Sequence, residues 1–333
     1  MSLSVVFAGT PEFAVPSLQA LHNDARYNLI GVITQSDKPV GRKQVLTSPP
    51  VKQFAMKHKI PVYQPEKLKD VFSDAENTIR RHSSSENVMA GSDVSLIVAD
   101  VMVVVAYGRI IPSSIISLFH YGVVNVHASL LPKYRGASPI QSAILGGDQK
   151  TGITIMQIDE KMDHGPIITQ RIENRLSPLS ATANQLHDEL SQLGAHALVD
   201  VLADYTQGKM NAQPQDHTQA TYCQKLTKES GRIDWSKSAV EIERMTRAYT
   251  PWPGAWTIWN GKRLVIYDGE VVEIGQLSLQ TGMVNIVDND TIIVACGDKT
   301  YLKIKTLQVE GRKVLPSSGF LHGVKDFSGC VLI

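Results

Sequence analysis

Cysteine is scarce in this chain, and the few cysteines follow no disulfide or metal-binding pattern. The 333 residues include three cysteines, at positions 223, 296 and 330. Because they are odd in number, widely spaced and without a C-x-x-C pair, they predict neither a disulfide framework nor a zinc site. The chain also lacks a run of about 18 apolar residues, the length that a membrane-spanning helix needs. Its start, "MSLSVVFAGTPEF", lacks the features of a signal peptide. We therefore expect a cytoplasmic protein with no membrane partner.

A strong charge of either sign is missing too. The chain has 33 Lys and Arg against 32 Asp and Glu, a formal net charge of +1. This balance excludes a uniformly basic surface for coating nucleic acid but permits a local basic patch. The first expected strand-to-helix turn, "FAGTPEFA", has only Gly9 where a dinucleotide-binding protein has G-x-G-x-x-G. A nicotinamide dehydrogenase is therefore disfavoured. No His, Cys and carboxylate cluster has ligand spacing, so we expect no metal.

What the chain does contain, over residues 1–205, is an alternation of strand and helix patterns. This alternation predicts an α/β domain with a parallel or mixed sheet and helices on both faces. Residues 73–93, polar and rich in serine, are expected to form a surface loop. Thr182 and Ser138 are expected to cap helices, the latter with Pro139 in the first helical position. The expected strands are 4–9, 28–34, 100–108, 122–129, 152–159 and 166–173, and the expected helices are 16–22, 48–58, 110–119, 138–145 and 181–205.

After residue 205 the alternation of strand and helix patterns ends. Residues 206–222 are polar and rich in glutamine, which is typical of a linker. From 223 to 333 short β patterns predominate, with one expected helix at 237–248, and they predict a small β-barrel. The pair Asn260-Gly261 predicts a type I′ hairpin turn.

The stretch "GVVNVHASLLPKYRGASPIQ", residues 122–141, carries the main candidate site. Side chains alternate along a strand, so Asn125 and His127 point to the same face, at the end of the strand. Ligands of open α/β sheets bind outside the carboxyl ends of strands. An amide and an imidazole there are suited to stabilising an oxygen that gains negative charge. The alternative, a core histidine beside a turn asparagine, stays open on this pattern alone. The loop that follows adds Lys133 and Arg135, two cations that either lie within reach of a ligand or are simply solvated.

A carboxylate follows in the next strand-loop unit, "GITIMQIDEKMDHGPII", residues 152–168. If adjacent strands carry them, Asp163 returns to the side of His127 and can orient its ring or relay a proton through water. A turn aspartate without a role in chemistry is the alternative.

Two further groups of residues suggest contact with a polyanion. Residues 34–52 hold Lys38, Arg42 and Lys43 in a segment without a periodic pattern, and such cations either bind a polyanion or are simply solvated. The tryptophans of the C-terminal region either stack on bases or pack in a core, and core packing is the simpler explanation for two of them. They are Trp252, Trp256 and Trp259.

Taken together, six segments closely resemble the methionyl-tRNA formyltransferase branch of the 10-formyltetrahydrofolate-dependent formyltransferase family. The resemblance runs from about residue 3 to 315, and it is weakest over 73–93 and at the C-terminal end. "RIDW" and "PWPGAW" indicate the methionyl-tRNA branch within the wider family. The segments are "FAGTPEFA", "VMVVVAYGRIIP", "NVHASLLPKYRGASPIQSAI", "TGITIMQIDEKMDHGPII", "RIDWSKSA" and "RAYTPWPGAW".

This resemblance implies a Rossmann-like N-terminal domain, an OB-like C-terminal barrel and a specific reaction. The reaction is formyl transfer from 10-formyltetrahydrofolate, the co-substrate, to methionine on initiator methionyl-tRNA, in translation initiation and by an enzyme that we expect to be monomeric. The implied domains are 1–205 for catalysis, 206–222 as a linker and 223–333 for binding tRNA. The implied residues are Asn125, His127 and Asp163 for catalysis, Ser129, Leu130, Leu131, Pro132, Val105, Tyr107 and Gly108 for folate, and Arg42, Lys43 and Lys38 for tRNA.

The chain departs from the family pattern at three places, and none removes a catalytic residue. Ala128 stands where glycine is usual, His164 replaces a usual threonine, and "GRKQ" replaces a more glycine-rich basic loop. Ala128 adds a methyl group that crowds the strand end, and a second histidine perturbs the pH profile. Two rivals stay open: a formyltransferase acting on a small amine, such as an amino sugar or glycinamide ribonucleotide, and an RNA-binding module without catalytic activity.

Overall fold

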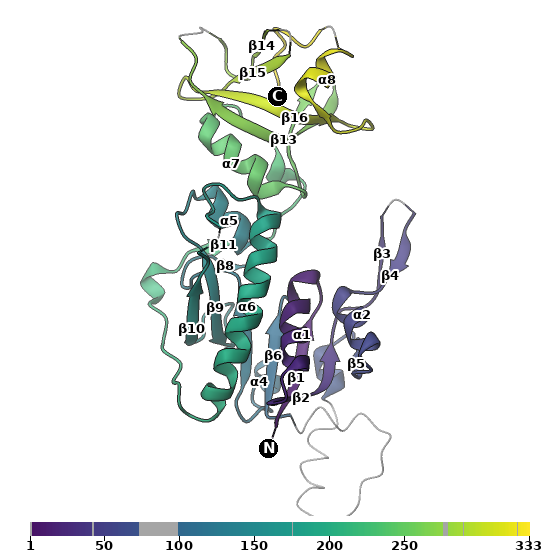
Figure 1. The fold of residues 1–333 in the computed structure, drawn as a ribbon, viewed down its shortest axis with the longest axis vertical. Coiled ribbons are helices and arrows are strands. Elements are labelled where there is room, and N and C mark those ends of the chain that lie inside the picture. The colour runs from purple at the N-terminus through teal and green to yellow at the C-terminus, as the bar shows by residue number, and fades with distance from the viewer. Residues whose placement is uncertain are drawn as a thin grey trace, which may run out of the picture. The chain divides into compact units, whose positions relative to one another are not determined.

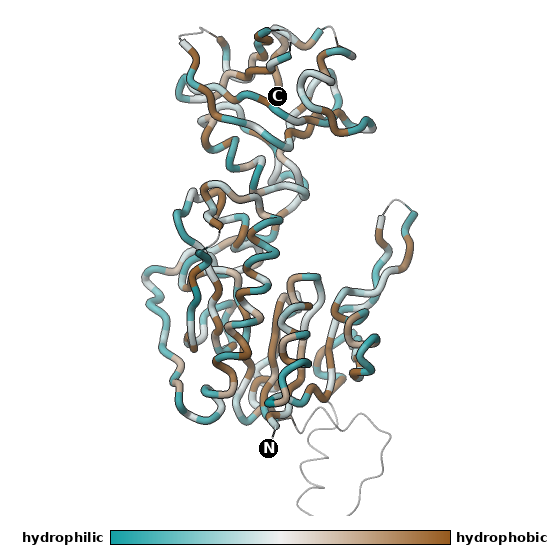
Figure 2. Tube along the Cα trace, in the orientation of Figure 1, coloured by the Kyte–Doolittle hydropathy of each residue, from teal (hydrophilic) through white to brown (hydrophobic). Residues whose placement is uncertain are grey.

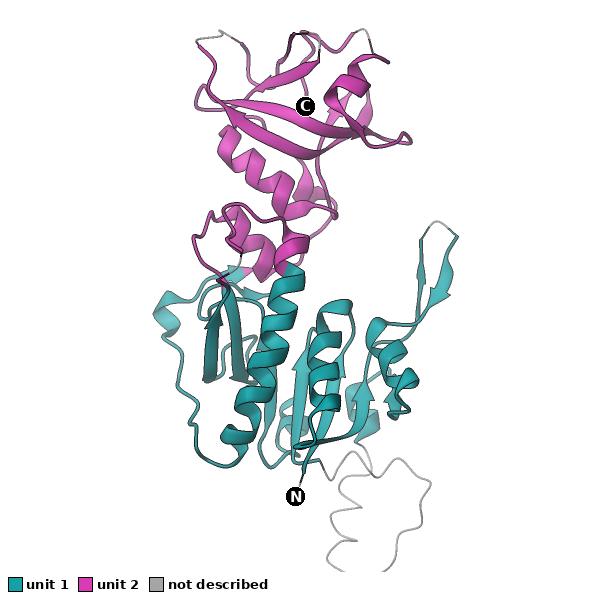
Figure 3. Ribbon diagram, in the orientation of Figure 1, with its two compact units in different colours: residues 1–136, 152–173, 187–222 teal, residues 137–151, 174–186, 223–333 magenta. Residues whose placement is uncertain are grey.

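The chain folds into two compact units, each with its own β-sheet (Figure 3). A computed structural model describes residues 2–41, 43–72, 99–174, 176–275, 279–288, 290–324 and 326–333, so the expected loop at 73–93 lies outside the described residues. Unit 1 comprises residues 1–136, 152–173 and 187–222, and unit 2 comprises 137–151, 174–186 and 223–333. Hydrophobic residues concentrate along the central strands of each sheet (Figure 2).

Unit 1 is built on a seven-stranded sheet in the order β10-β9-β7-β6-β1-β2-β5 (Figure 1). All neighbouring strands run parallel except β9, which is antiparallel to both β7 and β10. The Rossmann-like mixed sheet predicted for this region is thereby confirmed. Its strands are β1 (Leu3–Gly9), β2 (Tyr27–Ile33), β5 (Val62–Tyr63), β6 (Val101–Val105), β7 (Val123–His127), β9 (Gly152–Gln157) and β10 (Ile167–Ile172).

Helices cover both faces of this sheet, as the alternating pattern predicts. One face packs Met102 and Val104 of β6 against Ile115 of α4. The other face is covered by α6, because a Cβ added to Gly194 of α6 would lie 2.8 Å from Val126 of β7. The elements around the sheet are η1 (Glu12–Ala14), α1 (Val15–Asn23), α2 (Pro50–Lys57), η2 (Leu68–Val71), α4 (Ser113–Ile116), α6 (Ala183–Thr206) and η4 (His217–Gln219).

Several local predictions about unit 1 need correction. The helix expected at 110–119 is reduced to the single turn of α4, which begins only after Pro112. The basic segment without a periodic pattern forms an exposed hairpin of β3 (Lys38–Val40) and β4 (Val45–Thr47). Three residues per strand are too few to show an alternating pattern in the sequence. That residues 206–222 connect the two domains stays a prediction; in the structure they are grouped with unit 1, where Gln213 and Ile167 exchange backbone hydrogen bonds of 2.7 and 2.8 Å.

Unit 2 contains an antiparallel sheet in the order β12-β13-β16-β15-β14, with β17 paired to β16. This sheet confirms the small β domain predicted for the C-terminal region. Asn260 and Gly261 have φ values of 47° and 69°, so the hairpin turn between β12 and β13 has the predicted left-handed geometry. The strands are β12 (Ala255–Trp259), β13 (Lys262–Val272), β14 (Val284–Val287), β15 (Thr291–Ala295), β16 (Tyr301–Val309) and β17 (Leu315–Pro316).

The prediction that Ser138 caps a helix is wrong. Ser138 precedes α5 but does not cap it, because its hydroxyl donates a 2.5 Å hydrogen bond to the Gln224 carbonyl instead. Ser238, in contrast, forms a capping box with Glu241 at the start of α7. No described helix in either unit is long and apolar enough to cross a membrane. The remaining elements are α5 (Pro139–Leu145), η5 (Glu229–Gly231), α7 (Ala239–Tyr249), α8 (Ser317–Leu321) and the short pair β8 (Arg135–Gly136) and β11 (Tyr222–Cys223).

Candidate active site

His127 is the last residue of β7, and its imidazole is hydrogen-bonded at one ring nitrogen and faces a carboxylate with the other. The residue is 6% exposed, so the ring reaches solvent only at its edge. Its Nε2 atom lies 2.9 Å from the Tyr134 carbonyl oxygen. A carbonyl oxygen only accepts hydrogen bonds, so Nε2 carries a proton and donates it to Tyr134. The Nδ1 atom faces Asp163, with 3.7 Å between it and Oδ2.

Asp163 reaches this position by a route that strand order alone does not suggest. Strand β9 is antiparallel to β7 and pairs Gln157 with Val124, so the end of β9 lies beside the start of β7. The loop between β9 and β10 therefore folds back along the sheet to bring Asp163 to the far end of β7. Asp163 has φ of 49°, a left-handed conformation that aspartate tolerates better than most residues. Its Oδ2 atom accepts a 2.8 Å hydrogen bond from the Gly136 backbone N–H.

Asn125 lies two residues before His127, on the same face of β7. The face is the one opposite Val126, which α6 covers. Asn125 is half-buried, and among the described residues its side-chain amide makes no hydrogen bond. A half-buried amide without a protein partner is suited to binding a polar group of a ligand. The structure thus brings Asn125, His127 and Asp163 to one end of β7.

The predicted folate loop, residues 129–132, is anchored by side chains that the sequence did not single out. Thr154 of β9 donates a 2.6 Å hydrogen bond to the Ser129 carbonyl and accepts one of 3.1 Å from Leu131 N–H. Gln170 of β10 donates to the Leu131 carbonyl at 2.8 Å. The Ser129 hydroxyl is buried and donates to the Lys133 carbonyl at 2.6 Å. One signal was available, because Thr154 is a polar residue within the apolar run "GITIM".

The apolar residues of this loop differ in exposure, and Ala128, which stands where glycine is usual in the family, is buried. Leu131 is buried, whereas Leu130 and Pro132 are half-buried and keep apolar surface at the loop's edge. Ala128 is buried next to His127, and its φ is not in the left-handed region that requires glycine. Alanine therefore fits at the end of the strand without backbone strain.

The segment predicted to contact the pterin begins at the end of β6. Val105 is completely buried, and Tyr107 is 1% exposed, so burial raises the pKa of the Tyr107 hydroxyl. The Tyr107 carbonyl accepts hydrogen bonds from Thr10 Oγ1 at 3.2 Å and Gln35 Nε2 at 2.8 Å. Gly108 has φ of 80°, and a Cβ there would lie 2.6 Å from Gln35 Nε2. The Val105 and Tyr107 side chains thus belong to the core, and the backbone around Gly108 forms the surface.

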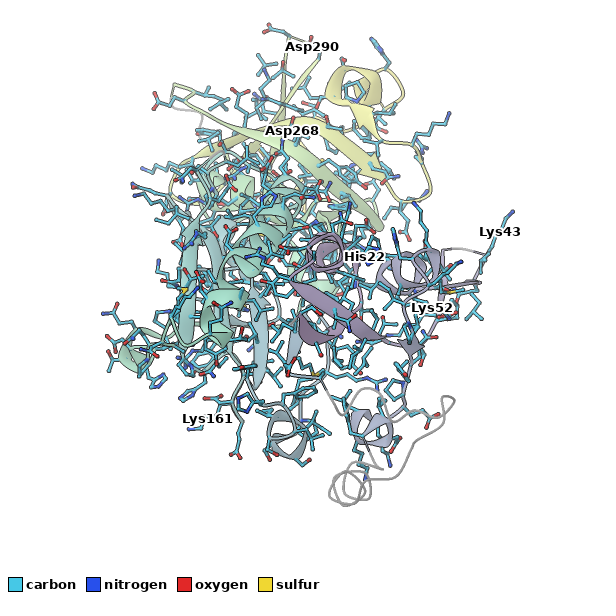
Figure 4. The ribbon with its side chains drawn as sticks, turned by 60° about the horizontal axis from the view of Figure 1, so that its bottom comes forward. His22, Lys43, Lys52, Lys161, Asp268 and Asp290 are labelled. Atoms are coloured by element: carbon cyan, nitrogen blue, oxygen red, sulfur yellow. The ribbon has the colours of Figure 1, made fainter. Side chains whose placement is uncertain are left out.

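Two of the cations predicted to bind tRNA, Lys38 and Lys43, lie on the β3–β4 hairpin. Lys43 is near the hairpin tip and its side chain extends away from the chain (Figure 4). Lys38 donates a 2.8 Å hydrogen bond to Gln35. Arg42 lies outside the described residues. At the base of the hairpin, hydrogen bonds from Gln64 and then Lys52 lower the pKa of Asp37 to about 2.

Two of the three tryptophans pack in the core of unit 2, as the core-packing explanation predicts, and the third is exposed. Trp256 is 8% exposed, and Trp259 packs edge-on against Phe320 and Phe327, with ring centroids 5.7 and 5.2 Å apart. Trp252 is 52% exposed, so stacking on a base stays a prediction for this residue.

Arg135 corrects an expectation about the loop after β7. The sequence places Lys133 and Arg135 as two cations within reach of a ligand, but Arg135 is 1% exposed. Its guanidinium donates to Gln215 Oε1 and lies 2.8 Å from His217 Nδ1. His164 stacks on His217, with ring centroids 4.0 Å apart and planes 7° apart. Sequence analysis missed Gln215 and His217, because nothing local links them to residue 135.

Across the described ranges, no group of three or more His, Cys, Asp or Glu side chains is arranged to hold a metal ion. The charged and polar groups near β7 are instead paired with backbone atoms, as in the bond from Gly136 to Asp163.

Comparison with known proteins adds a family and several relatives. A model described as "Formyl transferase" matches residues 1–225, and one described as "Formyl transferase, C-terminal domain" matches residues 225–325. A methionyl-tRNA formyltransferase of Roseiflexus sp. (strain RS-1) is 41% identical over 330 residues, which cover 99% of this chain and 95% of the relative. The corresponding protein of Acidobacterium capsulatum is 42% identical over 321 residues, 96% of each chain.

Two solved structures share the fold at low sequence identity. The N-formyltransferase from Helicobacter canadensis, solved with folinic acid and dTDP-3-aminofucose, has a TM-score of 0.61 and 17% identity over 91% of this chain and 98% of its own. A methionyl-tRNA formyltransferase from Clostridium thermocellum has a TM-score of 0.52 and 19% identity over 80% of this chain and 93% of its own. These two likenesses concern the fold alone.

Proposed function

The chain belongs to the formyl transferase family, and we propose that it transfers the formyl group of 10-formyltetrahydrofolate to the α-amine of methionine on initiator tRNA. The observation that carries this proposal is a match of nearly the whole chain, at 41% and 42% identity, to relatives named methionyl-tRNA formyltransferase. The match includes the C-terminal family domain, which begins at residue 225. We further propose that residues 1–205 carry out catalysis, 206–222 connect, and 223–333 bind the tRNA.

The residues at the end of β7 fit a folate co-substrate. When bound, 10-formyltetrahydrofolate supplies an activated formyl group on its N10 atom. The unpaired amide of Asn125 offers this group a hydrogen-bond donor in a half-buried setting. Leu130 and Pro132 offer apolar surface to the ring system, and the bonds from Thr154 hold their loop in place. Gly108, just after the end of β6, has no side chain, so the co-substrate can approach the backbone closely at this position.

Asn125 and His127 stabilise the charge that develops on the formyl oxygen during attack by the amine. Because His127 donates its Nε2 proton to Tyr134, the ring nitrogen available to the substrate is Nδ1. The Asp163 carboxylate lies 3.7 Å from Nδ1 and orients this edge of the ring, beside the amide donor of Asn125. A preorganised donor of this kind contributes about 2.7–4 kcal/mol to transition-state stabilisation. Both side chains project from the same face of β7, so one substrate group can lie against both.

Asp163 also provides a path for the proton that the amine loses. Free α-amines titrate near pH 8, so a useful fraction of the methionyl amine is neutral and nucleophilic at pH 7. The 3.7 Å between Asp163 Oδ2 and His127 Nδ1 is too long for a direct hydrogen bond. The carboxylate can therefore accept a proton from an amine that lies beside both residues. Asp163 then passes the proton toward the departing N10, directly or through water.

The proposed function is tested by offering the purified protein 10-formyltetrahydrofolate and one acceptor at a time. The acceptors are methionyl initiator tRNA, free methionine and a nucleotide-linked amino sugar. We expect formylation of the charged tRNA only. Comparable rates with free methionine or the amino sugar would instead identify a small-amine enzyme, and no transfer to any acceptor would favour an RNA-binding module without activity.

The exposed hairpin gives a prediction about tRNA binding. Lys43→Ala should raise the KM for methionyl-tRNA several-fold, leave the KM for folate unchanged, and reduce the slope of log KM against log salt by about one. The reason is that Lys43 lies near the tip of a hairpin whose strand residues are all exposed (Figure 4). Lys57→Ala, an equally exposed lysine on α2 of the same unit, is the matched control. Equal salt slopes for the two variants would remove Lys43 from the tRNA interface, and Arg42→Ala should behave as Lys43→Ala does.

We also infer that the enzyme acts as a monomer in the cytoplasm. The support for a monomer is that Asn125, His127 and Asp163 all come from unit 1 of a single chain. Light scattering on the active protein checks this inference, because a dimer at working concentrations would contradict it.

A further inference from the structure

Three consecutive residues, Tyr134 to Gly136, hold two of the three proposed catalytic side chains, those of His127 and Asp163. The Tyr134 carbonyl accepts the 2.9 Å hydrogen bond from His127, and the Gly136 N–H donates the 2.8 Å bond to Asp163. Both contacts are made by backbone atoms, so they depend on where the backbone lies. The conformation is unusual, because Tyr134 has φ of 60° and Gly136 has φ of 121°. Something other than local preference must therefore keep this segment in place.

The side chain of the middle residue, Arg135, supplies that anchor. It is the largest fully buried side chain of the described residues. Its Nε and Nη2 atoms donate to Gln215 Oε1 at 3.2 and 2.6 Å. Gln215 in turn donates from Nε2 to the backbone carbonyls of Asp163 at 2.9 Å and Gly165 at 2.8 Å. A chain of hydrogen bonds thus runs from the segment that holds His127 to the loop that carries Asp163.

His217 closes this network on its outer side. Arginine only donates hydrogen bonds, so the 2.8 Å contact from Arg135 Nη2 requires an unprotonated Nδ1 on His217. His217 stacks on His164, whose Nδ1 lies 2.6 Å from Asp159 Oδ2 and so carries a proton. Lys161, labelled in Figure 4, belongs to the same loop. Desolvation, His164, Arg135 and Lys161 lower the pKa of His217, and Asp159 partly opposes them.

We propose that Arg135 is a positioning residue which, through Gln215, sets the place of Asp163, and that it keeps this role only while His217 is neutral. Protonation of His217 removes the acceptor of one guanidinium bond and puts a second cation against Arg135. The bonds through Gln215 remain, but the anchor of the Asp163 loop is weakened and formyl transfer slows. This proposal rests on the proposed function, since turnover is one of its readouts, but loop mobility provides a second readout that needs no activity.

The direction of the pH effect follows from the lowered pKa. Above about pH 6.5, the ordinary histidine pKa, His217 is neutral in the folded and unfolded chains, and the bond to Arg135 is fully present. As the pH falls, the unfolded chain takes up the proton first and the folded chain follows at a lower pH. The contribution of this bond to stability and positioning is therefore lost toward acid.

The first test replaces His217 with a side chain that cannot be protonated but can still accept from Arg135. We measure the ratio of the kcat of His217→Gln to the wild-type kcat at each pH. This ratio should increase several-fold as the pH is lowered from about 8 to about 5.5. Taking this ratio cancels the titration of the substrate amine, which both proteins share. His196→Gln, an exposed histidine on α6, is the control and should give a flat ratio. A flat ratio for His217→Gln as well would overturn the pH dependence.

The same pair of proteins is compared by hydrogen exchange over residues 158–166, corrected for the intrinsic effect of pH. Wild type should lose protection in this loop toward acid, and His217→Gln should retain it. This result is expected even if the protein formylates none of the acceptors, so a failure of the proposed function remains distinguishable. Equal loss of protection in both proteins would overturn the role of His217.

The second test breaks the network at Gln215 while keeping its contact with Arg135. Gln215→Glu retains an acceptor for the guanidinium but loses the N–H donors to the Asp163 and Gly165 carbonyls. We expect kcat to fall about 10- to 100-fold with both KM values within about 2-fold, because misplacement of a catalytic group affects turnover. Gln207→Glu, exposed at the end of α6, is the control. If Gln215→Glu folds and keeps wild-type kcat, Arg135 has no positioning role.

Discussion

His127→Ala should lower kcat for formyl transfer about 10²- to 10³-fold, the effect of removing one preorganised donor to a developing oxyanion. The substitution deletes the Nδ1 edge, which faces Asp163 at 3.7 Å, and leaves Asn125 as the remaining donor of the pair. It also removes the hydrogen bond to the Tyr134 carbonyl. The measurement is single-turnover kinetics with methionyl-tRNA at saturating folate, which separates chemistry from product release.

Folate binding should survive this substitution. The loop at 129–132 is held by Thr154 and Gln170, and neither side chain is hydrogen-bonded to His127 among the described residues. We expect the folate Kd, measured by calorimetry, to stay within about 2-fold. His196→Ala serves as the control because His196 is exposed on α6. Wild-type kcat in His127→Ala, or a loss that arises entirely from weaker folate binding, would refute the role assigned to this histidine.

Asp163→Asn should lower kcat by a similar factor, about 10²-fold or more, without unfolding the loop. Asparagine has nearly the same shape and, like aspartate, tolerates the left-handed φ of 49° at this position. Its Oδ1 atom can still accept the hydrogen bond from Gly136 N–H. What disappears is the negative charge beside His127 and the capacity to take a proton. The loss therefore reports chemistry and not the shape of the loop.

The measurement for Asp163→Asn is kcat together with the midpoint of thermal unfolding. The midpoint should stay close to that of wild type, since the backbone and the bond to Gly136 are preserved. Asp188→Asn provides the control: Asp188 is an exposed carboxylate on α6 that pairs with a neighbouring histidine, and such surface pairs contribute little. Turnover equal to wild type in Asp163→Asn would leave proton transfer without a residue to perform it.

Patterns that depend on near neighbours in the chain were readable without the structure. The strand ending at His127 shows its two faces by alternation, so Asn125 and His127 were predicted to share one. Asn260-Gly261 predicted its own turn, because both residues tolerate positive φ. Local reasoning failed where a distant group competes for a side chain. Ser138 has the sequence of a helix cap, but its hydroxyl is taken by the Gln224 carbonyl.

The sequence by itself determined the class of each domain, the family and the chemical groups available, because periodicity and motifs are properties of adjacent residues. Tertiary structure alone decided how those groups meet. Asp163 follows an antiparallel strand that ends at the wrong end of β7, and only the folded loop returns it to His127. The sequence predicts that Arg135 faces a ligand, but in the structure its buried guanidinium donates to Gln215, which lies 80 positions further along the chain. Such contacts are set by chain closure over long separations, which leaves no local periodic signal.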